Sequence, residues 1–464
     1  MTLVALEALA IATVMPVVVG DLGGISLYGW VFSAFFLGDL VGIVAAGQQA
    51  DTHGLVRPYL LGLGLFALGL TVGGLAPSMP VLVAARAVQG FGAGAIPAVA
   101  YVSIGRQYPP GLRPRMFAIM ATAWVAPGIA GPALAGVVAT QLTWRAVFLG
   151  LLPLVAIAAV LTVPSLGRVG RVARGADGVS PDDAAPTGAG VGHADGNAGG
   201  PGAGARGRLL DAVRVAVGAG LVLAALDSHQ PLPLVVLGSA GAVIGVPSLR
   251  RLLPDGALRA RAGLPATVLL RGVLTFGFTG AEAFVPLMLV SLRGMSAAQA
   301  GLSLTAATLT WAVGAWVQAR LVGPWGAGRL IRVGLGLVVL GIGLIAVATS
   351  PSVPVGVGVV AWGLAGLGMG LAYSPITLLV LHQAPAGREG AATAGLQLSD
   401  VLGTALGAGV GGVVLAAAPG FGWDQRVALL LTFGVACAAV VMGLMVTRQL
   451  GGAAEPGPGH AGHG

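Results

Sequence analysis

Long apolar runs alternate with short polar turns from the first residues almost to the last. A helix that crosses a bilayer needs about 20 mainly apolar residues. Before residue 164 the pattern predicts six spans: Thr2–Val19, Leu27–Gln49, Pro58–Leu75, Pro80–Ile104, Met116–Thr140 and Ala146–Val163. After residue 208 it predicts two closely spaced spans and then six more: Leu209–Leu226, Leu232–Val246, Ala266–Leu292, Ala297–Val322, Leu330–Thr349, Val353–Leu381, Ala391–Ala417 and Val427–Val446. The total is about fourteen spans by hydropathy.

A polar break interrupts the spans over residues 164–208. It is rich in Gly, Ala, Pro and Asp and poor in large apolar residues, so it buries too little surface to fold. We therefore expect an all-α membrane protein with a six-helix bundle (1–163), a disordered cytoplasmic linker (164–208), an inserted transmembrane hairpin (209–250), a second six-helix bundle (251–448) and a disordered cytoplasmic tail (449–464). Two related six-helix bundles are a known transporter plan.

The composition supports this class. Hydrophobic residues make up 56% of the chain and charged residues 9%, against roughly 25% charged residues in soluble proteins. The formal charge of +8 is therefore no sign of a nucleic-acid partner. A single cysteine, Cys437, excludes disulfides within the chain and thiolate metal sites, and the histidines lack ligand spacing, so we expect no metal or cofactor. Since no nucleophile–base constellation is evident, we do not expect an enzyme.

The arginines predict the orientation, because loops on the cytoplasmic side carry the excess of positive charge. With the N-terminus inside, only Arg145, Arg293 and Arg426 fall on the outer side. Every other loop that contains arginine then lies inside, and both termini are cytoplasmic. The chain begins almost within its first apolar run, so we expect no cleaved signal peptide and a start that is abbreviated or misassigned.

One charged residue stands out within the spans. Arg86 lies in the apolar stretch Leu82–Gly94, and an arginine at membrane depth costs about 3 kcal/mol on insertion scales. It persists only beside a partner or a wet cavity. The small residues around it, Gly90 and Gly92 among them, allow a neighbouring backbone to approach closely.

Four acidic residues also lie within predicted spans: Glu7, Asp39, Glu282 and Asp400. The helical rise places Glu7 and Asp39 at similar depth, with Arg86 within reach of Glu7. Acids at this depth often relay protons, and they also attract cationic substrates; the sequence does not separate these roles. The alternative for Arg86 is a static ion pair that only holds helices together. Gln89 and Gln397 complete the expected substrate-binding set, with Glu282 and Asp400.

Two further stretches have the character of gates. In the loop Gly47–Pro58, Gly47 and Gly54 permit a tight turn, and Asp51, close to Arg57, either caps a helix or latches one conformation. In the fifth span Pro132 kinks a helix whose face is made of small residues, namely Gly128, Gly131, Ala135 and Gly136. That face serves packing alone, or a bend between the two bundles.

These residues resemble the major facilitator superfamily, most closely its fourteen-helix drug:proton antiporter branch. Gly47-x-x-Ala50-Asp51-x-x-Gly54-x-x-Arg57 is similar to its signature between helices two and three. Leu82-x-x-x-Arg86-x-x-Gln89-Gly90-x-Gly92 is similar to the fourth-helix signature, whose arginine is linked to proton coupling. Gly128-x-x-Gly131-Pro132-x-x-Ala135-Gly136 is similar to the fifth-helix antiporter signature. Leu6-Glu7 with Pro16, and Trp144-Arg145 with Phe148, resemble parts of helices one and six.

The resemblance implies a secondary transporter of the bacterial inner membrane. It would export small amphipathic, cationic compounds against proton entry, as a monomer, by rocking of one bundle against the other. Arg86, Glu7 and Asp39 would couple protons. Two other functions stay open: a lipid or glycolipid exporter, whose inserted hairpin borders a lateral opening, and a membrane sensor that transports nothing.

Overall fold

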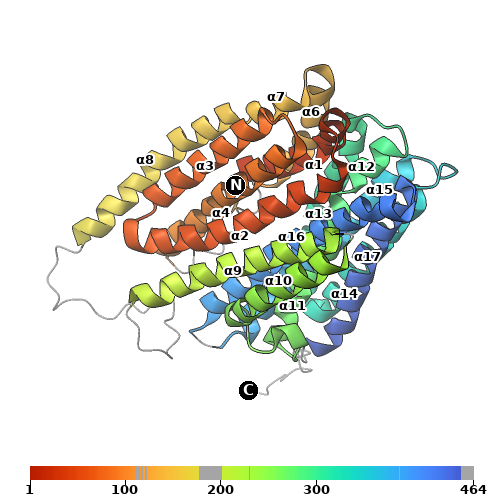
Figure 1. The fold of residues 1–464 in the computed structure, drawn as a ribbon. Coiled ribbons are helices and arrows are strands. Elements are labelled where there is room, and N and C mark those ends of the chain that lie inside the picture. Colours follow the sequence, from red (N-terminus) through yellow and green to blue (C-terminus); the bar gives the residue numbers. More distant parts are fainter. Residues whose placement is uncertain are drawn as a thin grey trace, which may run out of the picture.

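The computed structural model of the chain describes residues 1–109, 123–176, 201–228, 230–385 and 387–450, together with 112, 115, 116, 119 and 120. Within these residues the chain is helical and contains no β-strand (Figure 1). In the described part of the chain, thirteen helical segments are long and apolar enough to cross a membrane. The expected all-α membrane fold is confirmed.

The helices follow the predicted order closely. The first six spans correspond to α1 (Thr2–Leu22), α2 (Tyr28–His53), α3 (Val56–Gly74), α4 (Met79–Gln107), α6 (Val125–Gln141) and the pair α7 (Trp144–Leu149) and α8 (Leu152–Ala176). The later spans are α9 (Pro201–Asp227), α10 (Pro231–Leu252), the pair α11 (Leu264–Glu282) and α12 (Val285–Ser291), α13 (Ala297–Trp325), α14 (Ala327–Ala348), α15 (Gly356–Gln383), α16 (Glu389–Ala417) and α17 (Gln425–Val446). Helix α6 is the shorter apolar helix at the fifth position, and the first part of that span is only partly described.

Two predicted spans are each divided by a break. The span from Ala266 to Leu292 breaks after Glu282, and Pro286 lies in the first turn of α12. The span around Ala146–Val163 breaks at Gly150 and Leu151, just before Pro153. Proline lacks the N–H that would continue the hydrogen-bond ladder of the preceding helix, which explains why both breaks lie next to one.

The expected linker, residues 164–208, includes helical residues at both of its ends. Helix α8 continues to Ala176 and α9 begins at Pro201, so both helices reach into residues 164–208. The stretch 164–176 contains three arginines and two alanines, which are good helix formers, beside three glycines; proline suits a first helical turn. Residues 177–200, and the expected tail from 451 onward, lie outside the described residues.

Small residues bring α2 and α4 into close contact. A Cβ atom at Gly90 would overlap the carbonyl of Phe35, and one at Gly38 would overlap the carbonyl of Ala87. Close backbone approach of this kind is a common basis of helix association in lipid. It holds Arg86, on α4, against α2.

Contacts between the two bundles gather near the end where α1 finishes and α2 begins. Tyr28 Oη donates to the carbonyl of Ala283 at 2.8 Å, and Ser33 Oγ donates to the carbonyl of Ala405 at 2.7 Å. The Ala283 carbonyl lies at the break after α11, so a residue of the first bundle satisfies an acceptor there. Gly29 also lies against Gly412 of α16 with almost no space between the backbones.

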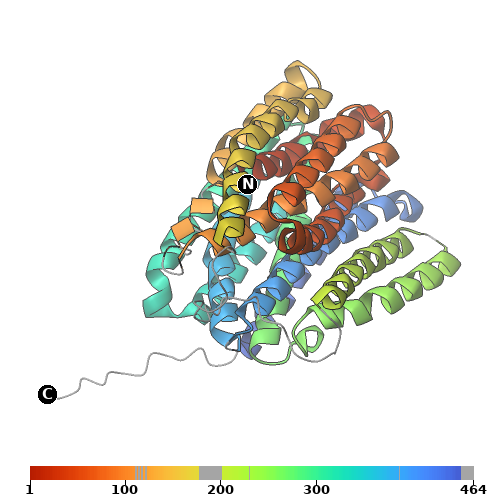
Figure 2. The same ribbon diagram turned by 90° about the vertical axis from the view of Figure 1, so that its left-hand side faces the viewer.

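The inserted hairpin lies at the edge of the molecule, in green in Figure 2. Helices α9 and α10 pack along each other, and α9 also packs against α2 and α16. A Cβ atom at Gly409 of α16 would lie 2.5 Å from Leu223 of α9 and 2.8 Å from Ser33 Oγ of α2. Helix α9 therefore covers the seam along which α2 and α16 meet.

Candidate transport site

Arg86 lies in the interior of the first bundle with only 2% of its surface exposed. Its Nη1 atom donates to Glu7 of α1 and, at 2.7 Å, to Gln89 Oε1 one turn further along α4. Its Nε atom donates to the Val31 carbonyl at 3.3 Å, and the guanidinium lies 4.1 Å from the centre of the Phe35 ring. The structure therefore places Arg86 beside Glu7, as expected, and adds two contacts from α2.

Two polar side-chain atoms beside the ion pair lack a hydrogen-bond partner among the described residues. Glu7 and Gln89 are fully buried, yet Glu7 Oε2 and Gln89 Nε2 have no hydrogen-bond partner among the described residues. A buried polar atom without a partner costs about 1–3 kcal/mol. The free oxygen of Glu7 is chemically able to hold a proton while the other oxygen stays bonded to Arg86.

Asp39 occupies a position between the bundles. It lies half-buried on α2, beside Gly94 of α4. Its carboxylate interacts electrostatically with Asp400 of the second bundle and with Glu7 of the first. Asp39 is thus within electrostatic range of two other acids that the sequence analysis selected, and among the described residues Glu7 alone of the three is bonded to an arginine.

A second buried arginine, Arg271 of α11, was missed by sequence reasoning. It is 1% exposed, donates from Nη2 to the carbonyl of Tyr373 at 2.8 Å and to Thr377 Oγ1, and its guanidinium lies 3.4 Å from the centre of the Tyr373 ring. The sequence does contain a feature that could have identified it, because Arg271 is a charged residue within a predicted span, as Arg86 is.

Tyr373 joins Arg271 to Asp400 of α16. The tyrosine Oη donates to Asp400 Oδ2 at 2.8 Å, and Arg271 interacts electrostatically with the same carboxylate. No direct ion pair joins them in the described part of the chain; Asp400 Oδ1 and the Nε and Nη1 atoms of Arg271 have no partner there. Tyr101 of α4 interacts electrostatically with both charged groups, so this second cluster borders the first bundle.

An aromatic row extends from this cluster toward the remaining acid. The ring of Tyr373 lies 5.4 Å from that of Trp311, Trp311 lies 5.7 Å from Phe278, and Phe278 stacks on Trp362 at 4.9 Å. Glu282 lies near the Trp362 indole, whose Nε1–H has no hydrogen-bond partner among the described residues. Phe278 and Trp362 are buried, while Trp311 and Tyr373 are half-buried. The row therefore connects two acids through rings that favour flat apolar groups.

The other expected substrate-binding residues, Glu282, Gln397 and Gln89, do not join Asp400 in one cluster. Glu282 follows Arg271 by eleven residues on α11, which is about 16 Å along a helix. It is therefore not part of the Arg271–Asp400 cluster. Gln397 is half-buried and lies about one turn before Asp400 on α16. Gln89 belongs to the Arg86 cluster.

The predicted gate residues lie in two places, the loop Gly47–Pro58 and helix α6, and the loop differs from the prediction. Helix α2 continues to His53, so Gly47 lies inside a helix with open space around it, and the expected turn at Gly47 is wrong. Gly54, with φ 75°, makes the turn. Arg57 is exposed near the start of α3, and the side chain of Asp51 lies outside those described.

The small face of α6 lies between the bundles. Cβ atoms at Gly128 and Gly136 would overlap Thr308 and Ala298 of α13, and one at Gly131 would lie 2.9 Å from Leu6 of α1. Pro132 lies inside α6, with its carbonyl close to Gly301 of α13. The predicted small face is thus a contact surface with the second bundle.

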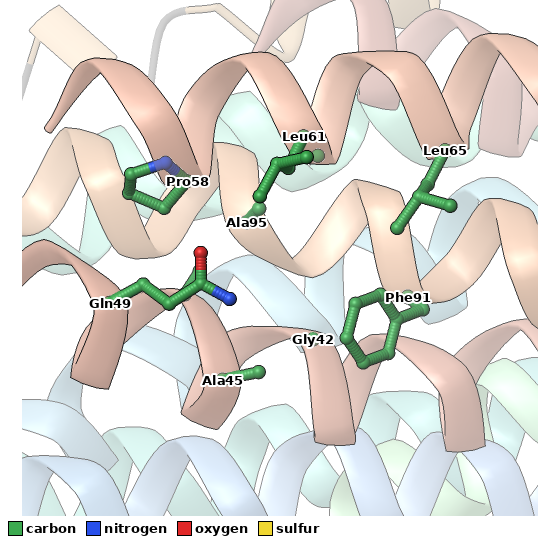
Figure 3. A pocket seen from close by; sticks show the side chains of 10 residues that line it. Gly42, Ala45, Gln49, Pro58, Leu61, Leu65, Phe91 and Ala95 are labelled. Carbon is green, nitrogen blue, oxygen red and sulfur yellow. The ribbon is translucent and has the colours of Figure 1, made fainter. Parts of the chain in front are cut away.

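A small cavity lies between α2, α3 and α4, beside the gate loop (Figure 3). Gln49 and Pro58 line one end and Phe91 the other. Its volume is about 20 Å³, enough for a water molecule and far below the roughly 300 Å³ of small ligand sites. It is not a substrate site.

Comparison with known proteins identifies the family. The family model of the Major Facilitator Superfamily matches residues 1–408. This chain belongs to that superfamily. A transporter fold with two charged clusters agrees with the membership.

Several proteins similar to this chain are named for multidrug efflux or multidrug resistance. A Mycobacterium tuberculosis (strain H37Rv) protein named "Probable multidrug-efflux transporter Rv1634" is 27% identical over 93% of this chain and 88% of its own length. The multidrug resistance protein Stp of the CDC 1551 / Oshkosh strain is 28% identical over 84% of this chain and 68% of its own. Multidrug resistance protein 3 of Bacillus subtilis is 30% identical over 33% of this chain and 30% of its own.

Solved structures agree on the fold. The crystal structure of a D-xylose–proton symporter superposes with a TM-score of 0.62 at 14% identity, covering 97% of this chain and 95% of that one. The peptide transporter PepTSo gives 0.63 at 13% identity, covering 97% of each chain. At these identities the likeness concerns the fold alone.

The buried pair predicts a specific pattern of stability. Arg86→Gln or Glu7→Gln alone leaves a buried charge without its partner, which is expected to cost about 3–5 kcal/mol. The double variant Glu7→Gln/Arg86→Gln removes both charges and should recover much of that loss. Thermal unfolding of the four purified proteins in one detergent measures the cycle. Single variants as stable as the double variant would contradict a charged pair.

Proposed function

We propose that the protein exports small amphipathic, cationic compounds in exchange for protons. The observation that carries this proposal is the aromatic row between Glu282 and Asp400, with its half-buried members Trp311 and Tyr373. Aromatic faces and carboxylates together suit a flat apolar cation. The multidrug names of the relatives support the same class.

The first bundle supplies the proton side of the exchange. Glu7 has a carboxylate oxygen without a hydrogen-bond partner among the described residues, Asp39 lies within electrostatic range of Glu7, and Arg86 supplies the compensating charge. A proton on Asp39 would weaken its repulsion with Asp400, and loss of that proton would restore the attraction for a cation. Proton and substrate cation would then compete for one group of acids, which is the simplest basis of antiport.

Alternating access would follow from movement of one bundle against the other. The contacts of Tyr28, Ser33 and Gly29 with the second bundle lie at the end that the arginine distribution assigns to the outside of the cell. This conformer would thus be closed to the outside. Each hydrogen bond is worth about 1 kcal/mol, so such contacts are weak enough to exchange during transport. The orientation assumes a bacterial inner membrane and cytoplasmic termini.

Asp39 provides the experiment that separates coupling from binding. In proteoliposomes with an imposed pH gradient, Asp39→Asn should lose uphill transport of a fluorescent cationic dye. It should keep exchange of labelled for unlabelled dye without a gradient, because exchange needs no proton. Asp39→Glu, which keeps a carboxyl group, is the matched control and should retain gradient-driven uptake. Full gradient-driven transport by Asp39→Asn would exclude Asp39 from coupling.

A cross-link tests the movement. Ser33→Cys and Gly409→Cys, in a Cys437→Ala background, place sulfur atoms of opposite bundles within bonding reach, provided that Leu223 turns aside. Oxidation should stop dye transport, and a reductant should restore it, while each single-cysteine variant keeps transporting under oxidant. Undiminished transport by fully cross-linked protein would contradict rocking at this seam.

A further inference from the structure

The loop between α10 and α11 surrounds a cavity of about 370 Å³. Its lining runs from Arg250, at the end of α10, through residues 253–258 to Arg259 and Arg261. Both flanking helices are long and apolar enough to span the membrane, so the loop between them lies at the height where lipid headgroups begin. The lower edge of Figure 2 shows this loop in green, below the hairpin.

The cavity is positively charged. Arg250, Arg259 and Arg261 are exposed and form no ion pair in the described part of the chain, and Asp255 is the acid of the lining. The neighbouring Arg251 is instead bonded to Asp211 of α9, at 3.3 Å. The three arginines are therefore available for an external anion.

The backbone of the loop arranges these arginines around the cavity. Gly256 has φ 88° and Ala260 has φ 48°. A left-handed conformation costs a non-glycine residue roughly 1–2 kcal/mol, so the turn at Ala260 is held by its surroundings. This turn separates Arg259 from Arg261, whose side chain lies across Gly256.

The loop is also fixed to the transport helices. Leu253 and Ala257 are buried, and a Cβ atom at Gly395 of α16 would lie 3.2 Å from Pro254. Beside these anchors, Leu258 is 42% exposed. The site thus combines unpaired guanidinium groups with an exposed apolar side chain, and it rests on the helix that carries Asp400.

We propose that this cavity binds the phosphate headgroup of an anionic phospholipid. Guanidinium groups bind phosphate oxygens through charge-assisted hydrogen bonds, and basic pockets between membrane helices on the cytoplasmic side suit such headgroups. Leu258 would contact the upper part of an acyl chain. This assignment does not depend on what the protein transports, because the loop is separate from both charged clusters.

The test compares lipids that differ only in the headgroup. Purified protein in detergent is unfolded thermally with added dioleoyl phosphatidylglycerol, dioleoyl phosphatidylcholine or inorganic phosphate. Phosphatidylglycerol should raise the unfolding midpoint by about 3 °C or more, as a ligand specific for the folded state does. The other two additions should raise it far less. Arg259→Gln/Arg261→Gln should abolish the difference while unfolding normally without lipid.

The control variant is Arg329→Gln/Arg332→Gln, which removes the same charge from exposed positions near the start of α14. It should respond to phosphatidylglycerol as the wild type does. If both double variants lost the stabilisation by phosphatidylglycerol equally, the stabilisation would come from general surface charge, and the proposal would be overturned. Equal stabilisation by inorganic phosphate would overturn the assignment to a lipid. Mass spectrometry of the lipid retained by each variant gives a second readout if a midpoint is poorly defined.

Discussion

The interaction on which this structure depends is the buried ion pair of Arg86 and Glu7. An arginine cannot remain uncompensated at membrane depth, so the helices around it have to supply a carboxylate, an amide and an aromatic face at short range. Helix α1 supplies Glu7, and α2 supplies Phe35 and the Val31 carbonyl. The glycine contacts between α2 and α4 are what allow these groups to approach. Glu7 Oε2 and Gln89 Nε2 have no hydrogen-bond partner in the described part of the chain, so the pair is not a fully satisfied bridge.

The second bundle meets the same constraint in a different way. Arg271 has no directly bonded acid in the described part of the chain, and Tyr373 stands between it and Asp400, contacting the guanidinium with its ring and the carboxylate with its hydroxyl. A bridged pair of this kind leaves both charges partly available. Asp39, within electrostatic range of Asp400 and Glu7, connects the two arrangements. A change in the charge of Asp39 therefore changes the electrostatic energy of an acid in each bundle. This interaction is the physical basis of the proposed coupling.

Much of the architecture could be predicted from the sequence, because bilayer thickness imposes the helix lengths and the arginines outside the spans separate one helix from the next. Helical rise alone placed Arg86 and Glu7 at compatible depths, and the packing of α1 beside α4 brings them into contact. Arg271 was missed although it breaks an apolar run as Arg86 does; its neighbours Tyr373 and Thr377 are distant in sequence, and only packing brings them together. The turn at Gly47 was wrong because α2 simply continues past it. The helix break after Glu282 lies beside Pro286, and the Ala283 carbonyl at the break accepts a hydrogen bond from Tyr28 of the other bundle; no local pattern contains both.

Proton release on substrate binding tests the central claim most directly. The purified wild-type protein is mixed with a saturating cationic dye substrate in weakly buffered detergent solution containing a pH indicator, and the same is done with Glu7→Gln/Asp39→Asn. Competition between a proton and a cation for the acids predicts that the wild type releases protons into solution when it binds, and that the double variant binds without release. Binding by the wild type with no proton release over the range from pH 6 to pH 8 would contradict the account.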